Sequence, residues 1–187
     1  MHHSLMVPGI GGSEPAHWQS RWQSVLLDAH RIAPRSWDEP DLDDWVDAID
    51  RAVGHARPVP VLVAHSLGCL AVAHWAVRVD DAATRVAGAF LVAPPDPACP
   101  EFPAAAPTFT IANAPLPIPA IVLSSSDDPY CSPDRAADMA DVWGAQLVEL
   151  GPRGHVNVAS GFGEWPEGLQ LLEDFVLTAR ETARQAG

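Results

Sequence analysis

Three short runs of apolar residues in this sequence are separated by stretches with helical periodicity. The runs are VPVLVAH (59–65), VAGAFLVAPP (86–95) and PAIVLSSSDDP (119–129), the last of which ends in polar residues. Because they are apolar at successive positions rather than at alternate ones, we expect strands that are buried on both faces. Helical connections between such strands make them parallel. The pattern therefore predicts a parallel β-sheet with helices packed on both of its faces.

The rest of the chain extends the same alternation. We expect shorter strands at 4–8, 31–36 and 145–151, and helices at 15–29, 41–55, 67–79, 133–143 and 167–184. The predicted fold class is α/β, a three-layer sandwich around a mostly parallel six-stranded sheet. A chain of 187 residues suits one hydrophobic core, so we expect a single domain over residues 1–187. The proline- and alanine-rich stretch 94–118 breaks the rhythm, and we expect a surface excursion that is too short for a large lid.

Composition excludes several classes of protein. The formal net charge is −13, and an acidic surface repels phosphate backbones, so we expect no nucleic-acid partner. No apolar run reaches the roughly 18 to 20 residues of a membrane span. The N-terminal residues lack the basic and apolar regions of a secretion signal. Three cysteines without metal-ligand spacing favour a reducing compartment, and we expect a cytoplasmic protein.

Polar residues follow several of the predicted strands at the point where each strand ends. Glycines follow the first strand, Ser66 follows the run 59–65, Asp127 and Asp128 follow the run after 119, and His155 lies beyond the last strand. In open parallel sheets, ligands bind at the carboxyl ends of the strands. The sequence therefore predicts an active site at this edge of the sheet.

Ser66 occupies the corner between a predicted strand and a predicted helix. A sharp strand-to-helix turn exposes a serine hydroxyl and requires small residues two positions before and two after it. Ala64 and Gly68 meet this requirement, although the usual G-x-S-x-G pattern has glycine where Ala64 stands. The alternative is that Ser66 only caps the following helix. His65, which points away from its neighbour, is expected to be structural rather than the base.

A serine nucleophile needs a base and an acid. His155 is the best candidate base because it lies in a glycine-containing loop after the last strand, whereas His17, His55 and His74 are expected to be surface or partly packed residues. Asp127 and Asp128 are candidates for the acid, and the alternative is that they only form a turn before a proline. The order serine, aspartate, histidine is the chain order of the α/β-hydrolase architecture.

Two backbone N–H groups are the candidates for an oxyanion hole. Leu67 follows the nucleophile, and Ile10 lies in the glycine-rich segment PGIGGS (8–13) after the first strand. Gly9 and Gly11 let this segment bend close to a ligand. The segment matches neither phosphate-binding glycine motif. We therefore expect no nucleotide, other cofactor or metal.

Four ordered motifs resemble the small serine hydrolases of the retinoblastoma-binding protein 9 family, particularly its bacterial branch. They are VPGIGGSEPAHWQSRW, LVAHSLGCLAVAHW, SSSDDPYCS and GHVNVASGFGEWPEG. The resemblance spans most of the chain and implies a compact α/β-hydrolase fold with little or no lid. It also implies a catalytic triad at Ser66, Asp128 and His155, and it is this resemblance that favours Asp128 over Asp127.

The sequence thus predicts a serine esterase that acts on small acyl esters through an acyl-enzyme. Candidate substrate contacts are Gly9, Gly11, Tyr130 and Trp165, although Trp165 could instead support the histidine-bearing segment. The alternatives are a thioesterase or amidase, and a protein-interaction domain with weak or vestigial activity, since a relative is named for a protein partner.

Overall fold

The computed structural model describes residues 3–185, which contain one six-stranded sheet in the order β2-β1-β3-β4-β5-β6. Every pair of neighbouring strands is parallel. The strands are β1 (His3–Val7), β2 (Ala29–Arg31), β3 (Pro60–His65), β4 (Gly88–Val92), β5 (Ala120–Ser124) and β6 (Gln146–Glu149). The helices are α1 (Trp18–Val25), α2 (Leu42–His55), α3 (Leu67–Arg78), α4 (Ala82–Arg85), α5 (Pro133–Trp143) and α6 (Pro166–Gln185), with 3₁₀ turns η1 (Ile10–Gly12) and η2 (Val158–Ser160).

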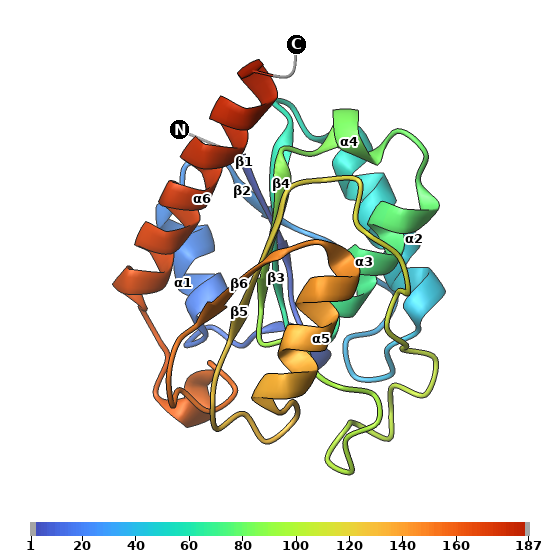
Figure 1. Cartoon of the computed structure of the whole chain (residues 1–187), viewed down its shortest axis with the longest axis vertical. Helices are drawn as coiled ribbons and strands as arrows, with labels where there is room; N and C mark the ends of the chain where they lie inside the picture. The colour runs from blue at the N-terminus through green and yellow to red at the C-terminus, as the bar shows by residue number, and fades with distance from the viewer. Residues whose placement is uncertain (1–2, 186–187) are drawn as a thin grey trace.

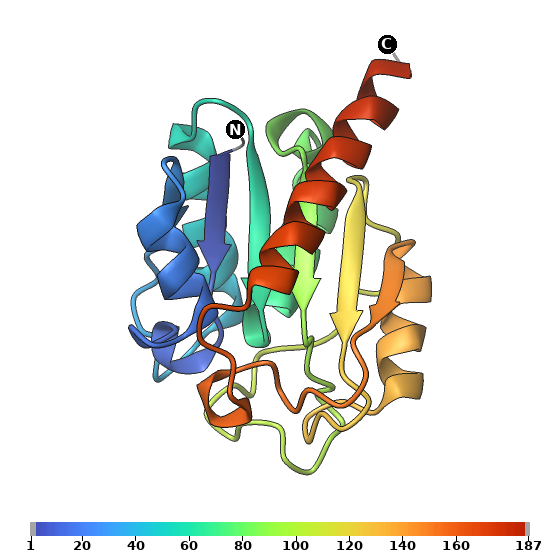
Figure 2. The same ribbon diagram turned by 90° about the vertical axis from the view of Figure 1, so that its left-hand side faces the viewer.

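The helices form the two outer layers of a three-layer sandwich. Figure 1 shows α1 and α6 on one face of the sheet and α2, α3 and α5 on the other. Seen from the side of α6, the strands lie next to one another and their arrowheads point the same way (Figure 2). The predicted fold class is therefore confirmed.

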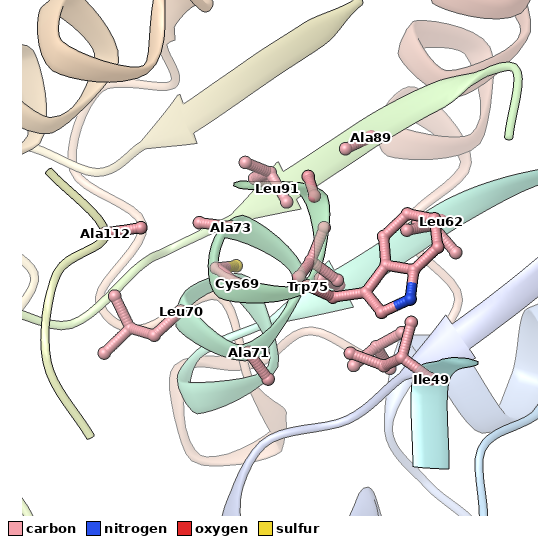
Figure 3. Close-up of a cluster of buried hydrophobic side chains, with 14 of the residues drawn as sticks. Ile49, Leu62, Cys69, Leu70, Ala71, Ala73, Trp75, Ala89, Leu91 and Ala112 are labelled. Atoms are coloured by element: carbon pink, nitrogen blue, oxygen red, sulfur yellow. The ribbon is translucent and has the colours of Figure 1, made fainter. Parts of the chain in front are cut away.

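Alternate residues of each central strand supply two separate hydrophobic cores. On β3, Val61 and Val63 pack with α1 and α6, whereas Leu62 and Ala64 pack with α2, α3 and α5. Figure 3 shows part of the second core, where Leu62 lies near Trp75 of α3 and Ile49 of α2. The continuous apolar runs in the sequence follow from this burial on both faces.

The structure differs from the prediction at β2 and at α4. The strand expected at 31–36 lies instead at Ala29–Arg31, because α1 already ends at Val25 and the chain reaches the sheet earlier. Pro34 has no N–H to donate to a neighbouring strand, which disfavours an extension of β2. The short helix α4 was not predicted, and its four residues are too few for a periodic pattern.

The connections after the strands gather at one end of the sheet, below the arrowheads in Figure 2. Residues 94–118 contain no helix or strand, and their backbone is held by local turns and by hydrogen bonds from Asp96 N–H to the Tyr130 carbonyl and from Leu116 N–H to the Trp143 carbonyl. Phe109 and Ala106 of this segment are buried in the core on the α2 and α3 side. Between residues 3 and 185, no helix is both long and apolar enough to cross a bilayer.

Candidate active site

Ser66 stands between β3 and α3 in a strained backbone conformation. Its φ is 56° and its ψ is −127°, a region that side chains other than glycine rarely adopt. Its N–H donates to the carbonyl of Val92 at 3.0 Å, which ties the turn to β4. The Ser66 hydroxyl makes no capping hydrogen bond to α3, so the alternative in which it is only an N-cap is wrong. Its Oγ instead lies 2.9 Å from Nε2 of His155.

Close packing around this turn explains its small residues. A Cβ at Gly68 would lie 2.1 Å from the carbonyl oxygen of Val7, so α3 can only approach β1 with glycine there. A Cβ at Gly9 would lie 2.8 Å from Cβ of Ser66, which puts the chain after β1 directly against the serine. Ala64 is fully buried, and its methyl group fits where the common pattern has glycine.

The structure brings His155 and Asp128 to the serine. Nδ1 of His155 lies 2.9 Å from Oδ2 and 3.0 Å from Oδ1 of Asp128. Both side chains are almost fully buried. Since a carboxylate only accepts hydrogen bonds, Nδ1 carries the proton and Nε2 is free to accept the hydroxyl proton of Ser66. This arrangement can take a proton from a serine hydroxyl and stabilise the resulting imidazolium.

Asp127 differs from Asp128 in its exposure and in its hydrogen-bond partners. It is exposed, and its Oδ1 accepts hydrogen bonds from the Ser125 hydroxyl at 2.8 Å and from the Gly154 N–H at 2.7 Å. These two hydrogen bonds hold the pKa of Asp127 below its ordinary value. Asp127 therefore fastens the segment next to His155, while only Asp128 contacts the imidazole.

Side chains from distant elements hold the segment that carries His155. Nε1 of Trp18 donates to the Val156 carbonyl at 2.9 Å. Nε2 of His65 lies 2.9 Å from the carbonyl of His155 itself. Because a carbonyl only accepts, His65 is the donor and cannot serve as the base, as its position in the sequence suggested.

His17 was expected to be a surface or partly packed residue, and that expectation is wrong. It is 3% exposed. The centroids of the His17 and His65 rings are 4.8 Å apart. Burial, followed by the charges of Arg31 and His155, lowers the pKa of His17 to about 4. Burial likewise lowers the pKa of His65 far below its ordinary value. Both rings are therefore neutral beside His155 at neutral pH.

Ile10 and Leu67 begin η1 and α3, so neither N–H has an acceptor within its own helix.

Arg31 of β2 holds the end of the segment that carries Ile10. Its guanidinium donates to the carbonyls of Gly12 and Ser13 and to the Ser20 hydroxyl, the last at 2.7 Å. Sequence reasoning missed Arg31, since nothing in the local sequence relates this strand residue to a glycine-rich turn.

A cavity of about 190 Å³ opens onto Ser66 and His155. Its wall is formed by Gly9, Ile10, Ser13, Glu14, His17, His65, Ser66, Pro95, Pro103, Tyr130, His155, Asn157, Val158 and Ala159. Of the candidate substrate contacts, Gly9 and Tyr130 lie in this wall, and the Tyr130 ring centroid is 4.5 Å from that of His155. Pro95 and Pro103 show that the excursion 94–118 borders the site.

Two candidate substrate contacts, Gly11 and Trp165, do not line the cavity. The Gly11 N–H donates to the Trp37 carbonyl at 3.0 Å, and a Cβ at Gly11 would meet no atom within 4 Å. Trp165 packs on the rings of Trp18 and Trp22, at centroid distances of 5.3 and 5.6 Å. It therefore supports the histidine-bearing segment, the other role that the sequence left open.

Within residues 3–185, no three His, Cys, Asp or Glu side chains are grouped so that they could hold a metal ion.

A family model described as serine hydrolase matches residues 4–174. This chain belongs to the serine hydrolase family. Among solved structures, a protein described as a YdeN-like hydrolase from Pectobacterium atrosepticum is 35% identical with a TM-score of 0.83, over 96% of this chain and 92% of that one. The predicted resemblance to small serine hydrolases is confirmed, and the protein is an esterase-type hydrolase of the α/β-hydrolase superfamily.

More distant structures share the fold. The ydeN gene product of B. subtilis is 21% identical with a TM-score of 0.75, over 94% of this chain and 98% of that one. The type II thioesterase BorB from the borrelidin biosynthetic cluster is 15% identical with a TM-score of 0.67, over 93% and 92%. No curated protein matches the chain.

Proposed function

We propose that this serine hydrolase cleaves small acyl esters through an acyl-enzyme on Ser66. The observation that carries the proposal is the position of the His155 ring, which lies 2.9 Å from Ser66 on one side and 2.9 Å from Asp128 on the other. A serine hydroxyl is a weak nucleophile until a base takes its proton. In the proposed mechanism Ser66 is the nucleophile, His155 transfers the proton and Asp128 orients the imidazole.

In the first half of the reaction, Oγ of Ser66 attacks the ester carbonyl carbon while its proton moves to Nε2 of His155. The tetrahedral intermediate collapses when the bond to the leaving oxygen breaks, and His155 gives its proton to that oxygen. The released product is an alcohol. Asp128 keeps the imidazole in the required tautomer and stabilises its charged form throughout.

In the second half, His155 takes a proton from water, and the resulting hydroxide attacks the acyl carbon. The bond from that carbon to Oγ breaks, and the proton returns to Ser66. A carboxylic acid leaves, and the enzyme is restored. The negative oxygen of both tetrahedral intermediates would accept hydrogen bonds from the N–H groups of Ile10 and Leu67.

The test is the Ser66→Ala variant with p-nitrophenyl acetate as substrate. We expect kcat/KM to fall by about 10⁴-fold or more, because the nucleophile is gone. Circular dichroism serves as the control for an intact fold. Activity retained by a folded Ser66→Ala variant would rule out Ser66 as the nucleophile.

A fluorophosphonate probe tests the same chemistry without a chosen substrate. We expect labelling at Ser66 in the unmodified protein and loss of labelling in the His155→Ala variant. An interaction domain with an inert serine would not react with the probe. Matched oxygen esters, thioesters and amides with one acyl group then measure which bond is cleaved fastest.

A further inference from the structure

One of the residues that line the cavity next to Ser66, His17, has a buried ring nitrogen with no hydrogen-bond partner among the described residues. Nε2 of His17 is buried and makes no hydrogen bond within the part of the chain that the structure describes. His17 itself is 3% exposed and lines the cavity. Leaving a buried polar group unpaired costs more than a typical hydrogen bond contributes. Because His17 also lines the cavity beside Ser66, a substrate atom is a candidate partner for this nitrogen.

The other ring nitrogen shows which kind of partner is missing. Nδ1 of His17 accepts a hydrogen bond from the N–H of Gln19 at 3.2 Å, where it caps the start of α1. An accepting Nδ1 bears no proton, so in the neutral ring the proton is on Nε2. The low pKa of His17 agrees with a neutral ring. The missing partner of His17 is therefore a hydrogen-bond acceptor.

The size and charge of the cavity narrow the choice of acceptor. At about 190 Å³, it is smaller than the roughly 300 to 1,000 Å³ of sites that hold drug-sized ligands. The acidic side chain of Glu14 is part of the wall, and it disfavours a second negative charge in the same small space. These features favour a short acyl group with an uncharged oxygen, such as an ether, hydroxyl or carbonyl oxygen.

We propose that His17 is a substrate-binding residue whose Nε2–H donates to an uncharged oxygen in the acyl group, so that the enzyme prefers short oxygenated acyl esters over alkyl esters of the same size. The inference rests on the proposed function. The nitrogen is covered in the unliganded protein, and side-chain adjustment on binding, which is common at binding surfaces, brings the acceptor to it.

Two esters of matched size test this preference. p-Nitrophenyl methoxyacetate and p-nitrophenyl butyrate have acyl groups of equal length, and an oxygen replaces one methylene group in the first. The ether oxygen also activates the ester chemically, so each kcat/KM is divided by the rate constant for hydroxide-catalysed hydrolysis of the same ester. The oxygen preference is the corrected kcat/KM of the methoxyacetate ester divided by that of the butyrate ester.

The His17→Asn variant keeps an acceptor at the N-cap and removes the Nε2 donor. We expect the oxygen preference of the unmodified enzyme to exceed 1 and to fall about five- to tenfold in His17→Asn, the loss of one hydrogen bond. His74→Asn is the matched control, because His74 lies on α3 and is not part of the cavity wall. We expect that variant to keep the preference.

Three outcomes separate the possibilities. An unchanged preference in a folded His17→Asn variant overturns the inference, and His17→Ser, which also caps a helix, provides the same measurement if the first variant does not fold. An unmodified enzyme without an oxygen preference overturns it with no variant at all. Failure of a fluorophosphonate to label Ser66 in the unmodified enzyme would instead reject the proposed function.

Discussion

Two regions of different construction meet at the candidate active site. The serine corner, residues 64–68, lies between a central strand and a helix, and its geometry depends on these two elements and on close backbone contacts with the ends of β1 and β4. The histidine loop, residues 150–165, contains only the short 3₁₀ turn η2. Its geometry depends on hydrogen bonds that its carbonyls accept from Trp18 and His65 and that its Gly154 N–H donates to Asp127, three residues that lie outside the loop.

Both regions contain backbone strain, but they sustain it differently. Ser66 has a φ of 56°, and in the histidine loop Val156 and Trp165 have φ values of 48° and 45°. Positive φ is especially unfavourable for large or β-branched residues. The backbone of the serine corner is fixed by β3 and α3 and by backbone contacts with the neighbouring strands β1 and β4, whereas the loop is fixed by contacts between its own backbone and distant side chains. The comparison indicates that the regular structure of the sheet and helix holds the nucleophile, while side chains from other elements hold the segment that carries its base.

The largest expected effect comes from a comparison of two aspartate variants. It distinguishes the carboxylate that orients the imidazole from the carboxylate that supports the histidine loop. In Asp128→Asn the carboxylate that fixes the His155 tautomer is lost, and we expect kcat to fall by about 10⁴-fold, as for the equivalent change in a serine protease. Asp127→Asn keeps an oxygen that can accept from Ser125 and Gly154, and we expect less than about a tenfold change. Steady-state kinetics on p-nitrophenyl acetate measures both. Equal losses in the two variants would show that Asp127 and Asp128 share one role.

A methyl group added to each region tests how closely the backbone of that region is packed. Gly68→Ala puts a carbon against the Val7 carbonyl, and we expect a loss of about 3 kcal/mol or more in the free energy of unfolding, or no folded protein. In Gly163→Ala the nearest atom to the new carbon is 3.4 Å away, at the end of the Arg21 side chain. We expect a change within about 1 kcal/mol there. Urea unfolding measures both, and a stable Gly68→Ala variant would contradict the close approach of α3 to β1.

Two tryptophans, Trp18 and Trp22, donate hydrogen bonds to backbone carbonyls of the histidine loop. Their variants test which of these bonds positions the base. Trp18→Phe removes the hydrogen bond to the carbonyl of Val156, next to His155, and Trp22→Phe removes one to the carbonyl of Glu164 at 2.9 Å. We expect each to cost about 1 to 3 kcal/mol of stability. Because only the first bond lies beside the base, we expect kcat to fall about three- to tenfold in Trp18→Phe alone. Equal kcat values in the two variants would contradict a positioning role for Trp18.

The smallest expected effect is a pH dependence of stability from His17. Its pKa is about 4 in the folded protein against the ordinary 6.5. Between these values the unfolded chain binds a proton that the folded protein does not, so stability is lost as pH falls from about 6.5 towards 4. In urea unfolding at pH 7 and pH 5, we expect His17→Asn to lose less stability than the unmodified protein. The variant retains His65, which contributes in the same direction, so a smaller loss remains. An identical loss in both proteins would contradict the buried, neutral state of His17.

The fold, Ser66 and His155 were predictable because each leaves a local pattern. Strands buried on both faces require runs of apolar residues, and the small residues around Ser66 reflect backbone atoms within contact distance. The choice between Asp127 and Asp128 had no such local basis. Both carboxylates follow β5, and only the turn that directs one side chain to His155 and the other to Gly154 distinguishes them.

The supporting residues were beyond local reasoning. His17 and Arg31 have ordinary sequence surroundings, and their roles come from contacts across the sheet edge with His65 and with the segment after β1. Trp165 was ambiguous because an aromatic residue near a site can pack or bind, and only its position against Trp18 and Trp22 decides.

By itself, the sequence determined the parallel sheet, the strand-to-helix serine and the order of the reactive residues along the chain, because hydrophobic burial and steric crowding act on neighbouring positions. The tertiary structure alone decided which other histidines line the cavity with His155 and which side chains hold the histidine loop. These depend on hydrogen bonds between residues far apart in the chain, whose direction no local pattern encodes.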